Sequence, residues 1–268
     1  MFPMAAYLKR IGLQREPLAN RNGLFELHRA QFFHIPFENF DIQLGHEIGL
    51  DPMHLFDKLI NRQRGGYCFE LNGLLLMALK ELGFQARPLL ARVHLNGSPG
   101  GRTHQLSEVT LGSQTWLVDV GFGAGGPRQP LQLGTEEETW VEGFGYRMRN
   151  ISPWGAMLET YDDGIWKPSY SFDLGYAGPG DIAMGNFYTS HSPDTHFTQS
   201  RTASLPVPHG RISLRNFDLT YLRKGEKQVT RIQPGQAYLE ALKTHFGIDL
   251  GADYSALKPL AEERGVSG

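Results

Sequence analysis

The spacing of apolar residues changes along this chain, and that change is the strongest constraint on its fold. Between Leu71 and Leu82 apolar side chains recur at every third or fourth position, which predicts a helix with one buried face that ends at Gly83. After Arg87-Pro88 the apolar segments become short and β-prone, and clusters of Gly, Ser, Pro and Asn separate them. A helical first third followed by strands predicts an α+β fold.

Local signals place the starts of two helices. Asp51-Pro52 combines a preferred N-cap side chain with proline at the first helical position. Gly65-Gly66 ends that unit, and a second helix begins near Tyr67 or Cys68.

The rest of the chain is predicted from shorter segments. Strands are expected at 89–95, 105–111 and 115–120. Because β structure continues to about Phe172, a barrel or a sandwich fits the middle third. The last third mixes strands at 211–214 and 228–232 with an amphipathic helix over 234–246, and we interpret it as a closing lobe.

Length and charge exclude several classes of protein. With 268 residues the chain can hold two or three packed units around a sizeable core. Its net charge is −2 and it has no run of Lys and Arg, so nucleic acid is not expected as a partner. The apolar stretch in residues 1–13 is interrupted by Lys9 and Arg10, which makes it too short for a signal peptide or a membrane span. We therefore expect a cytoplasmic enzyme without membrane contact.

The sequence contains one cysteine, Cys68, which excludes an internal disulfide framework and any metal site built from several cysteines. Cys68 lies at the predicted start of a helix, directly after Gly65-Gly66-Tyr67 and four positions after Arg64. The free N–H groups and the positive end of the helix dipole favour a thiolate there, and a nearby cation favours it further. This position predicts a nucleophile; the alternative is a small buried apolar side chain.

A histidine and a carboxylate come together if Gly112-Ser113 forms a two-residue turn, a sequence suited to the turn type that has glycine first. Leu106 then faces Asp119. His104 lies two residues from Leu106, so His104 and Asp119 point to one side of the sheet as diagonal neighbours roughly 7 Å apart at the backbone. In a triad with Cys68, His104 would accept the proton of the thiol and Asp119 would orient the imidazole.

The opposite side of the same hairpin is apolar and is expected to face the core. Its side chains are Val109, Leu111, Trp116, Val118 and Val120. Two alternatives remain for His104 and Asp119. Either they are polar residues of an exposed strand, or a one-residue bulge moves Asp119 to the other face.

A glycine-rich segment, residues 121–127, follows Asp119 directly. Its backbone N–H groups are suited to binding phosphate oxygens. The segment lacks the Gly-Lys-Ser/Thr ending of a nucleotide P-loop and opens no obvious helix, so a plain turn is the alternative. The histidines show no metal-site spacing, and no metal is expected.

Five segments carry motifs that are familiar in combination. They are Ile35-Pro36-Phe37-Glu38-Asn39-Phe40-Asp41, Arg64-Gly65-Gly66-Tyr67-Cys68-Phe69-Glu70-Leu71-Asn72, Arg102-Thr103-His104, Trp116-Leu117-Val118-Asp119-Val120-Gly121-Phe122-Gly123, and Asn186-Phe187-Tyr188-Thr189-Ser190 with Pro193 and Phe197. Together they resemble the arylamine N-acetyltransferase family, in the expected order and over most of the chain. The chain departs from the common pattern at Phe40 and at Ser107-Glu108, and neither departure touches the expected triad.

The resemblance implies a helical domain over 1–85 that carries the nucleophile, a β-barrel domain over 86–185 and an α/β lid over 186–268. It places a cysteine-protease-like triad between the first two domains.

The resemblance also implies roles for individual residues. Cys68, His104 and Asp119 form the triad, the same three residues that the hairpin selects. Phe37 and Phe122 line the pocket for an aromatic acceptor, since aromatic rings pack well against an aryl group. The alternative is that both are ordinary core phenylalanines.

Acetyl-CoA is the co-substrate that the resemblance implies. The best candidate positions for binding it are Thr103, Gly123, Ala124, Gly125 and Gly126. Glu38 and Arg64 each lie in a family motif, and we expect either a buried ion pair that holds the cysteine loop or a pair of surface charges.

The implied reaction has two steps: Cys68 takes the acetyl group from acetyl-CoA, and an arylamine, a hydrazine or an N-hydroxyarylamine then takes it from the cysteine. Three alternatives stay open. They are a cysteine amidase or peptidase that deacylates with water, a binding module without catalysis, and a transferase of propionyl or malonyl groups. The expected partners are these small molecules and CoA, with the chain as a monomer or a homodimer.

Overall fold

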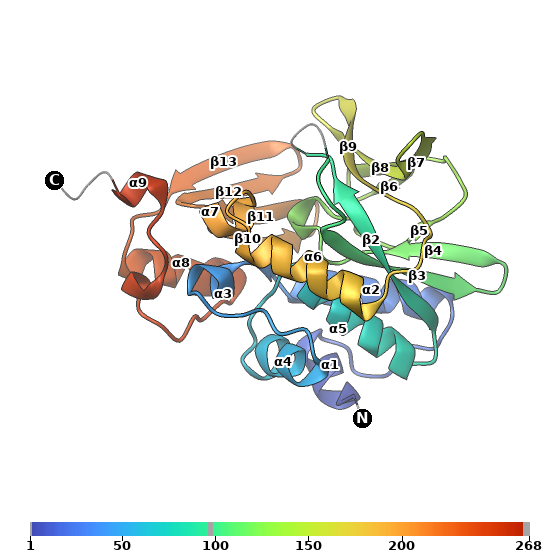
Figure 1. Cartoon of the computed structure of the whole chain (residues 1–268), viewed down its shortest axis with the longest axis horizontal. Coiled ribbons are helices and arrows are strands. Elements are labelled where there is room, and N and C mark those ends of the chain that lie inside the picture. The colour runs from blue at the N-terminus through green and yellow to red at the C-terminus, as the bar shows by residue number, and fades with distance from the viewer. Residues whose placement is uncertain (1, 96–98, 265–268) are drawn as a thin grey trace.

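The computed structural model describes residues 2–95 and 99–264. The first third is helical, as predicted, and is coloured blue to cyan in Figure 1. Its elements are α1 (Met4–Arg10), α2 (Arg21–His34), α3 (Phe40–Gln43), α4 (Pro52–Phe56), the π-helical segment η1 (Asp57–Asn61) and α5 (Cys68–Glu81). Within the described residues, no helix is long and apolar enough to cross a membrane.

Both predicted helix starts are confirmed. Asp51 is the N-cap of α4, and its carboxylate accepts hydrogen bonds from the second and third N–H groups of the helix. Pro52 occupies the first helical position. α5 begins at Cys68, and Gly83 follows its end with a φ of +83°, a conformation that residues with a side chain rarely adopt.

The middle third forms one antiparallel sheet of eight strands in the order β5-β4-β3-β2-β9-β8-β7-β6. In chain order these are β2 (Gln85–Val93), β3 (His104–Leu111), β4 (Gln114–Val118), β5 (Leu131–Gln132), β6 (Thr139–Val141), β7 (Phe144–Ile151), β8 (Gly155–Asp162) and β9 (Ile165–Phe172). Leu131 of β5 and Met148 of β7, from strands far apart in the sheet, share one apolar cluster with Leu106. The sheet therefore curls into a near-closed barrel rather than a sandwich, and it ends at Phe172 as predicted.

The β3–β4 hairpin has the predicted register. Its two-residue turn begins at Gly112, which has a φ of +60°. Pairing continues from this turn to Ser107 opposite Val118 without a bulge. His104 and Asp119 therefore fall on the same side of the sheet.

This hairpin is covered on both faces. Val109, Trp116 and Val118 pack into one core with the apolar face of α5, as predicted. The side with His104 and Asp119 faces the barrel interior, and these two residues are 2% and 0% exposed. The alternative of an exposed polar strand is wrong, because the barrel buries the face that the sequence pattern left uncovered.

The last third adds a five-stranded sheet in the order β1-β10-β11-β12-β13. Its strands are β1 (Phe37–Glu38), β10 (Thr202–Val207), β11 (Gly210–Arg215), β12 (Asp218–Arg223) and β13 (Glu226–Arg231). α8 (Gln236–Phe246) packs against this sheet through Tyr238 and Leu242. This part of the chain contains the expected strands at 211–214 and 228–232 and the expected helix at 234–246, each with slightly shifted ends. The pairing of β1 with β10 was not predicted, and it places a strand of the first third at the edge of this sheet.

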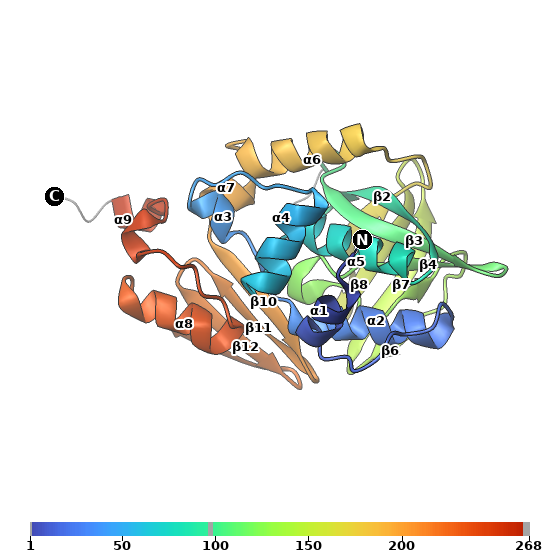
Figure 2. The same cartoon turned by 90° about the horizontal axis from the view of Figure 1, so that it is seen from below.

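α6 (Pro179–His191) lies across the outside of β2 and the start of α5 (Figures 1 and 2). Gly185 permits this close approach, because a Cβ atom there would lie 2.9 Å from the ring of Phe69. The boundary that we expected between residues 185 and 186 falls inside this helix. Three short elements complete the last third: α7 (His196–Gln199), η3 (Tyr254–Ala256) and α9 (Ala261–Arg264).

Candidate active site

Cys68 is the first residue of α5 and is 3% exposed. Its Sγ lies 3.7 Å from the backbone oxygen of Thr103, the residue before His104. At this end of a helix the unpaired N–H groups and the dipole favour negative charge. Gly121 packs against the same turn, since a Cβ atom there would lie 2.8 Å from the Cα of Cys68.

The structure brings His104 and Asp119 into direct contact. His104 Nε2 and Asp119 Oδ2 are 2.9 Å apart at the end of the hairpin opposite its turn. The other carboxylate oxygen of Asp119 accepts hydrogen bonds of 2.9 Å from Asn72 Nδ2 and from the N–H of Gly121. Three donors therefore fix this buried carboxylate.

Asn72 joins the helix to the hairpin and was not singled out from the sequence. Its Nδ2 also donates to the backbone oxygen of Gln105 at 2.6 Å, and its Oδ1 accepts from the N–H of Val120 at 2.9 Å. Asn72 lies one helical turn after Cys68, on the same face of α5. That spacing is the signal in the sequence that points to it.

Opposing effects set the charge of His104. Burial lowers the pKa of the imidazole, but the charge and hydrogen bond of Asp119 and the hydrogen bond to Cys68 outweigh it and raise the pKa to about 10. For Asp119, burial works to raise the pKa, and the pKa is nevertheless lowered by His104 and by the donated hydrogen bonds. At neutral pH the pair is therefore an imidazolium beside a carboxylate.

A second buried histidine, His28, contacts the backbone of Asp119. His28 Nε2 donates to the backbone oxygen of Asp119 at 3.1 Å, and its side chain is completely buried. Burial lowers the pKa of His28 to about 4, so its ring is neutral at physiological pH. The sequence offers no signal for this contact, because residues 28 and 119 are remote in the chain.

Aromatic rings surround the imidazole inside the barrel. The ring centroids of Phe122 and Tyr170 each lie 5.0 Å from that of His104, and 4.9 Å from each other. Phe37, the other predicted pocket residue, packs against the cluster that contains Cys68, and its ring lies 6.0 Å from Phe197. Phe122 thus contacts the histidine side of the site and Phe37 the cysteine side.

The predicted cofactor residues occupy different surroundings. Gly123, Ala124 and Gly125 form a single 3-10 turn, η2 (Gly123–Gly125), and the N–H of Gly126 is bonded to the oxygen of Gly123 at 3.0 Å. For Ala124 only the backbone is described. Gly126 is buried, whereas a Cβ atom at Gly125 would meet nothing within 4 Å.

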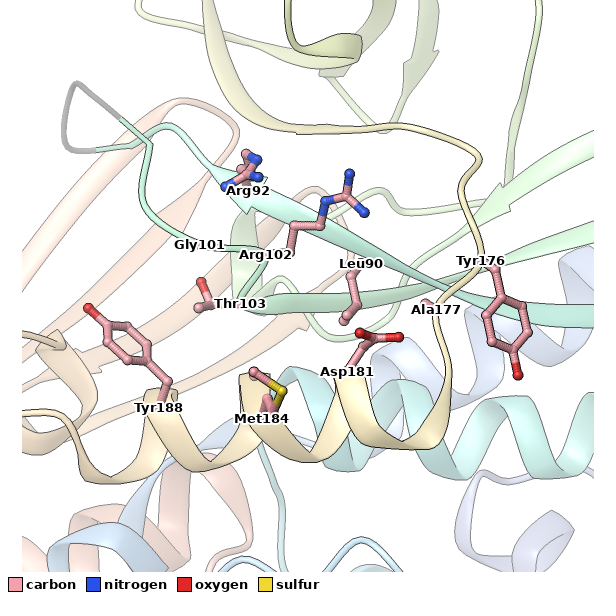
Figure 3. A pocket seen from close by; sticks show the side chains of 11 residues that line it. Leu90, Arg92, Gly101, Arg102, Thr103, Tyr176, Ala177, Asp181, Met184 and Tyr188 are labelled. Carbon is pink, nitrogen blue, oxygen red and sulfur yellow. The ribbon is translucent and has the colours of Figure 1, made fainter.

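Thr103 lines a pocket of about 500 Å³ between β2 and α6 (Figure 3). Arg92 and Arg102 lie on one side of this pocket, and Met184 and Tyr188 rise from α6 on the other. Arg92 donates to the backbone oxygen of Gly100 at 2.7 Å, and Arg102 pairs with Asp173. Within the described residues, no group of three or more His, Cys, Asp or Glu side chains is placed to hold a metal ion.

Comparison with known proteins assigns the family. Residues 22–254 match the family model for N-acetyltransferases. The chain is 36% identical to the arylamine N-acetyltransferase / N-hydroxyarylamine O-acetyltransferase of Salmonella typhimurium, with 91% of this chain and 88% of that protein covered. It is 34% identical to the arylamine N-acetyltransferase of Mycolicibacterium smegmatis, with 92% of each covered.

Solved structures agree with these relatives. The Salmonella typhimurium enzyme superimposes with a TM-score of 0.89 at 33% identity, covering 94% of this chain and 95% of that one. The Mycobacterium marinum arylamine N-acetyltransferase in complex with CoA gives a TM-score of 0.89 at 29% identity, covering 95% and 96%. The chain therefore belongs to the arylamine N-acetyltransferase family.

Proposed function

We propose that this protein transfers the acetyl group of acetyl-CoA to arylamines, hydrazines or N-hydroxyarylamines, with Cys68, His104 and Asp119 as its catalytic triad. The observation that carries this proposal is the connected series from the sulfur at the start of α5, through the imidazole, to a carboxylate held by three donors. Family membership supports the same activity.

In the first step the Cys68 thiolate attacks the carbonyl carbon of acetyl-CoA. An Sγ–C bond forms and the thioester C–S bond breaks. The leaving CoA thiolate takes the proton held on His104, so the enzyme keeps a neutral imidazole and an acetylated cysteine. Asp119 holds the ring in place and stabilises its charged form before that transfer.

In the second step the nitrogen of the acceptor attacks the acetyl carbon. The new N–C bond forms, the C–Sγ bond breaks, and a proton of the amine passes to His104. This restores the imidazolium and the thiolate. Arylamines suit this step because they are weak bases that stay unprotonated, and hence nucleophilic, at neutral pH.

We assign the acceptor site to Phe37, which packs beside Cys68, and to Phe122, which packs beside His104. Flat aromatic walls favour an aryl ring through stacked or edge contacts. Their positions beside Cys68 and His104 support this assignment.

For CoA we propose two regions, the pocket beside Thr103 and the η2 turn with Gly126. Three lining residues support the pocket as a nucleotide site: Arg92 and Arg102 bring guanidinium groups, which keep further donors besides those bonded to Gly100 and Asp173, and Tyr188 brings an aromatic face. The η2 turn supports the proposal less, because its Gly126 N–H is already bonded within the turn.

Two substitutions separate these regions. Arg102→Met removes a cation from the pocket, and Gly125→Val adds bulk to the turn where the protein leaves space. Each variant is compared for acetylation of Cys68 by acetyl-CoA and by a chromogenic acetyl ester without the CoA moiety. A selective loss with acetyl-CoA identifies the region that binds CoA, since damage to the triad slows both donors.

Intact mass spectrometry tests the proposed function. The protein is mixed with acetyl-CoA, with and without an arylamine. We expect one acetyl group on the parent, none on Cys68→Ser, and loss of the acetyl group when the arylamine is added. Acetyl-CoA hydrolysis that the arylamine does not stimulate would instead favour a cysteine hydrolase. Propionyl-CoA and malonyl-CoA in the same assay define the acyl preference.

The same proposal predicts double-reciprocal plots with parallel lines for acetyl-CoA and arylamine. Intersecting lines would mean direct transfer in a ternary complex. We also propose a cytoplasmic location, because a reducing compartment protects a free nucleophilic thiol from oxidation.

A further inference from the structure

Phe197, the last residue of the fifth sequence motif, packs beside the start of α5. The centroid of its ring lies 6.0 Å from that of Phe37 and 5.6 Å from that of Tyr67, and Tyr67 directly precedes Cys68. Both Phe197 and Phe37 are partly buried residues that pack against the apolar cluster containing Cys68. An aromatic surface therefore extends from Phe37 to Phe197 on the cysteine side of the site.

The backbone that carries Phe197 belongs to α7, a helix of only four residues. A helix this short is unstable by itself and leaves carbonyl oxygens at its end without partners of its own. The oxygen of His196 accepts the N–H of Ser200 at 2.8 Å. The oxygens of Phe197 and Ser200, by contrast, take donors from another part of the chain, and those donors decide where the ring is held.

Two buried amides of α3 supply these donors, and α3 lies beside α7 (Figure 2). Asn39, the N-cap residue of α3, directs Nδ2 to the oxygens of Phe197 and Ser200 at 2.8 and 2.7 Å. Gln43, the last residue of α3, directs Nε2 to the same two oxygens at 2.7 and 3.2 Å. Asn39 and Gln43 are 2% and 1% exposed. The four N–H bonds of the two amides thus match the four lone pairs of the two oxygens, and we call this arrangement the amide clamp.

The start of α3 is in turn fixed to the segment that leads to Cys68. Glu38, directly before Asn39, forms the expected ion pair with Arg64, and the pair is confirmed as buried. The same carboxylate accepts the N–H of Gly65 at 3.1 Å. The amide clamp therefore holds α7 to a part of the chain that is itself held beside the cysteine.

We propose that Asn39 and Gln43 are positioning residues for acceptor binding: their amide groups hold the ring of Phe197 against Phe37 and so complete the surface on which an aryl acceptor packs. All four N–H bonds of the clamp are used on α7, so none is left for the triad. The clamp should therefore matter for the second step of the reaction and not for the first. This inference rests on the proposed function, and it adds two residues that need not contact the acceptor themselves.

Two substitutions remove donors from the clamp. Gln43→Met keeps a side chain of similar length without N–H groups. Asn39→Asp gives up both donors but keeps an oxygen for the N–H of Thr202, which Asn39 accepts at 2.8 Å. The matched control is Gln236→Met, which removes an exposed amide that contacts Glu240 on α8, and it should behave as the parent.

The experiment compares two acceptors, aniline and hydrazine, of which hydrazine has no ring. In a reaction with an acetyl-enzyme intermediate, kcat/KM for the acceptor reports only its reaction with that intermediate. The ratio of the two kcat/KM values within one variant therefore cancels general damage to the triad. The burst of CoA released on mixing with acetyl-CoA alone measures the first step.

We expect Gln43→Met and Asn39→Asp to lower kcat/KM for aniline about fivefold, because the ring that packs against the aryl group is no longer held. For hydrazine kcat/KM should change by less than about twofold, and so should the rate of the CoA burst. A merely structural role would lower kcat/KM for both acceptors alike. Equal losses with both acceptors, or no loss with either, would overturn the proposal.

Phe197→Leu shows whether the clamp acts through the ring. This variant removes the ring but keeps the backbone oxygens of α7, and it should lower the ratio of aniline to hydrazine at least as much as Gln43→Met does. The double variant should then have the same ratio as Phe197→Leu alone, whereas additive losses would contradict the proposal. If neither clamp variant folds, Phe197→Leu decides, since an unchanged ratio in this variant contradicts a role of the ring in acceptor binding.

The parent separates the two levels of the argument. A parent that takes no acetyl group from acetyl-CoA would refute the proposed function. A parent that acetylates both acceptors, with the same ratio in the clamp variants, would refute only the role of Asn39 and Gln43.

Discussion

At the scale of single residues, the site depends on a histidine that stays charged although it is buried. Water is excluded from His104, yet Asp119 and Cys68 hold its pKa at about 10. The ring therefore keeps a positive charge beside the sulfur at pH 7, which favours the thiolate.

This predicts that His104→Gln slows alkylation of Cys68 at neutral pH by about tenfold or more, because the amide cannot carry the charge. Iodoacetamide kinetics measure it, and because Cys68 is the one cysteine in the sequence the label reports a single site. Cys68→Ser provides the blank. An unchanged rate in folded His104→Gln would show that another group activates the sulfur.

His28 makes a different prediction, which concerns stability against pH. Its folded pKa of about 4 lies below the usual value for histidine. Between pH 6.5 and 4, His28 is therefore protonated in the unfolded chain but stays neutral in the folded protein. The stability that neutral His28 contributes is complete above pH 6.5 and is lost as the pH falls toward 4.

His28→Gln keeps a donor for the backbone oxygen of Asp119 but does not titrate. We expect the fall in unfolding free energy between pH 6.5 and 4 to be shallower in this variant, by up to about 1.4 kcal/mol per pH unit. Urea unfolding at several pH values measures the two slopes. Equal slopes would mean that His28 is protonated in the folded protein.

At the scale of elements, the sequence predicts local geometry well and long-range contacts poorly. The turn at Gly112 determines the register of β3 and β4, and hence the meeting of His104 with Asp119, because a two-residue turn leaves one register. The start of α5 follows from helix periodicity in the same way.

What the sequence did not reveal depends on elements that lie far apart in the chain. β1 is two residues long and pairs with β10, and no period can be read in so short a strand. The contact of His28 with Asp119 and that of Lys58 with Glu70 depend on how α2 and η1 pack. The buried ion pair between Glu38 and Arg64 was predictable only because the family resemblance places each residue in a motif.

The packing of α5 against the end of the hairpin yields a prediction at Gly121. A Cβ atom there would lie 2.6 Å from Asn72 Nδ2 and 2.8 Å from Cys68 Cα, so Gly121→Ala must push the helix away from the hairpin. We expect a loss of about 1–3 kcal/mol in stability and a large loss of acetyl transfer. Gly180→Ala, in the exposed first turn of α6 where a Cβ atom meets nothing within 4 Å, is the matched control and should lose neither. Full activity in Gly121→Ala would show that this close approach is not required.

At the scale of the whole molecule, one buried arginine connects the three parts of the fold. Arg128, which follows the glycine-rich segment, is 1% exposed and donates to the backbone oxygens of Val207 and Gly210 at the β10–β11 turn. It also pairs with Glu142 at 2.6 Å, and Glu142 pairs with Arg29 of α2 at 2.7 Å. The barrel, the second sheet and the N-terminal helices thus meet at one set of charges.

Replacing Arg128 tests whether this junction stabilises the molecule as a unit. Arg128→Met fills a similar volume but leaves the buried oxygen of Gly210 and the partly buried oxygen of Val207 without this donor, while Glu142 keeps Arg29 as a partner. We expect a loss of about 2–4 kcal/mol, since each buried acceptor without a partner costs about 1–3 kcal/mol. The control is Arg231→Met, an arginine whose ion pairs lie on the surface, and it should change stability by less than about 1 kcal/mol. Urea unfolding followed by both fluorescence and circular dichroism measures the two variants.

The two signals also test whether the sheets unfold together. Because Arg128 contacts both sheets, the fluorescence and circular dichroism curves of Arg128→Met should no longer coincide if the sheets then unfold independently. A variant as stable as the parent would show that the apolar cores alone hold the three parts together.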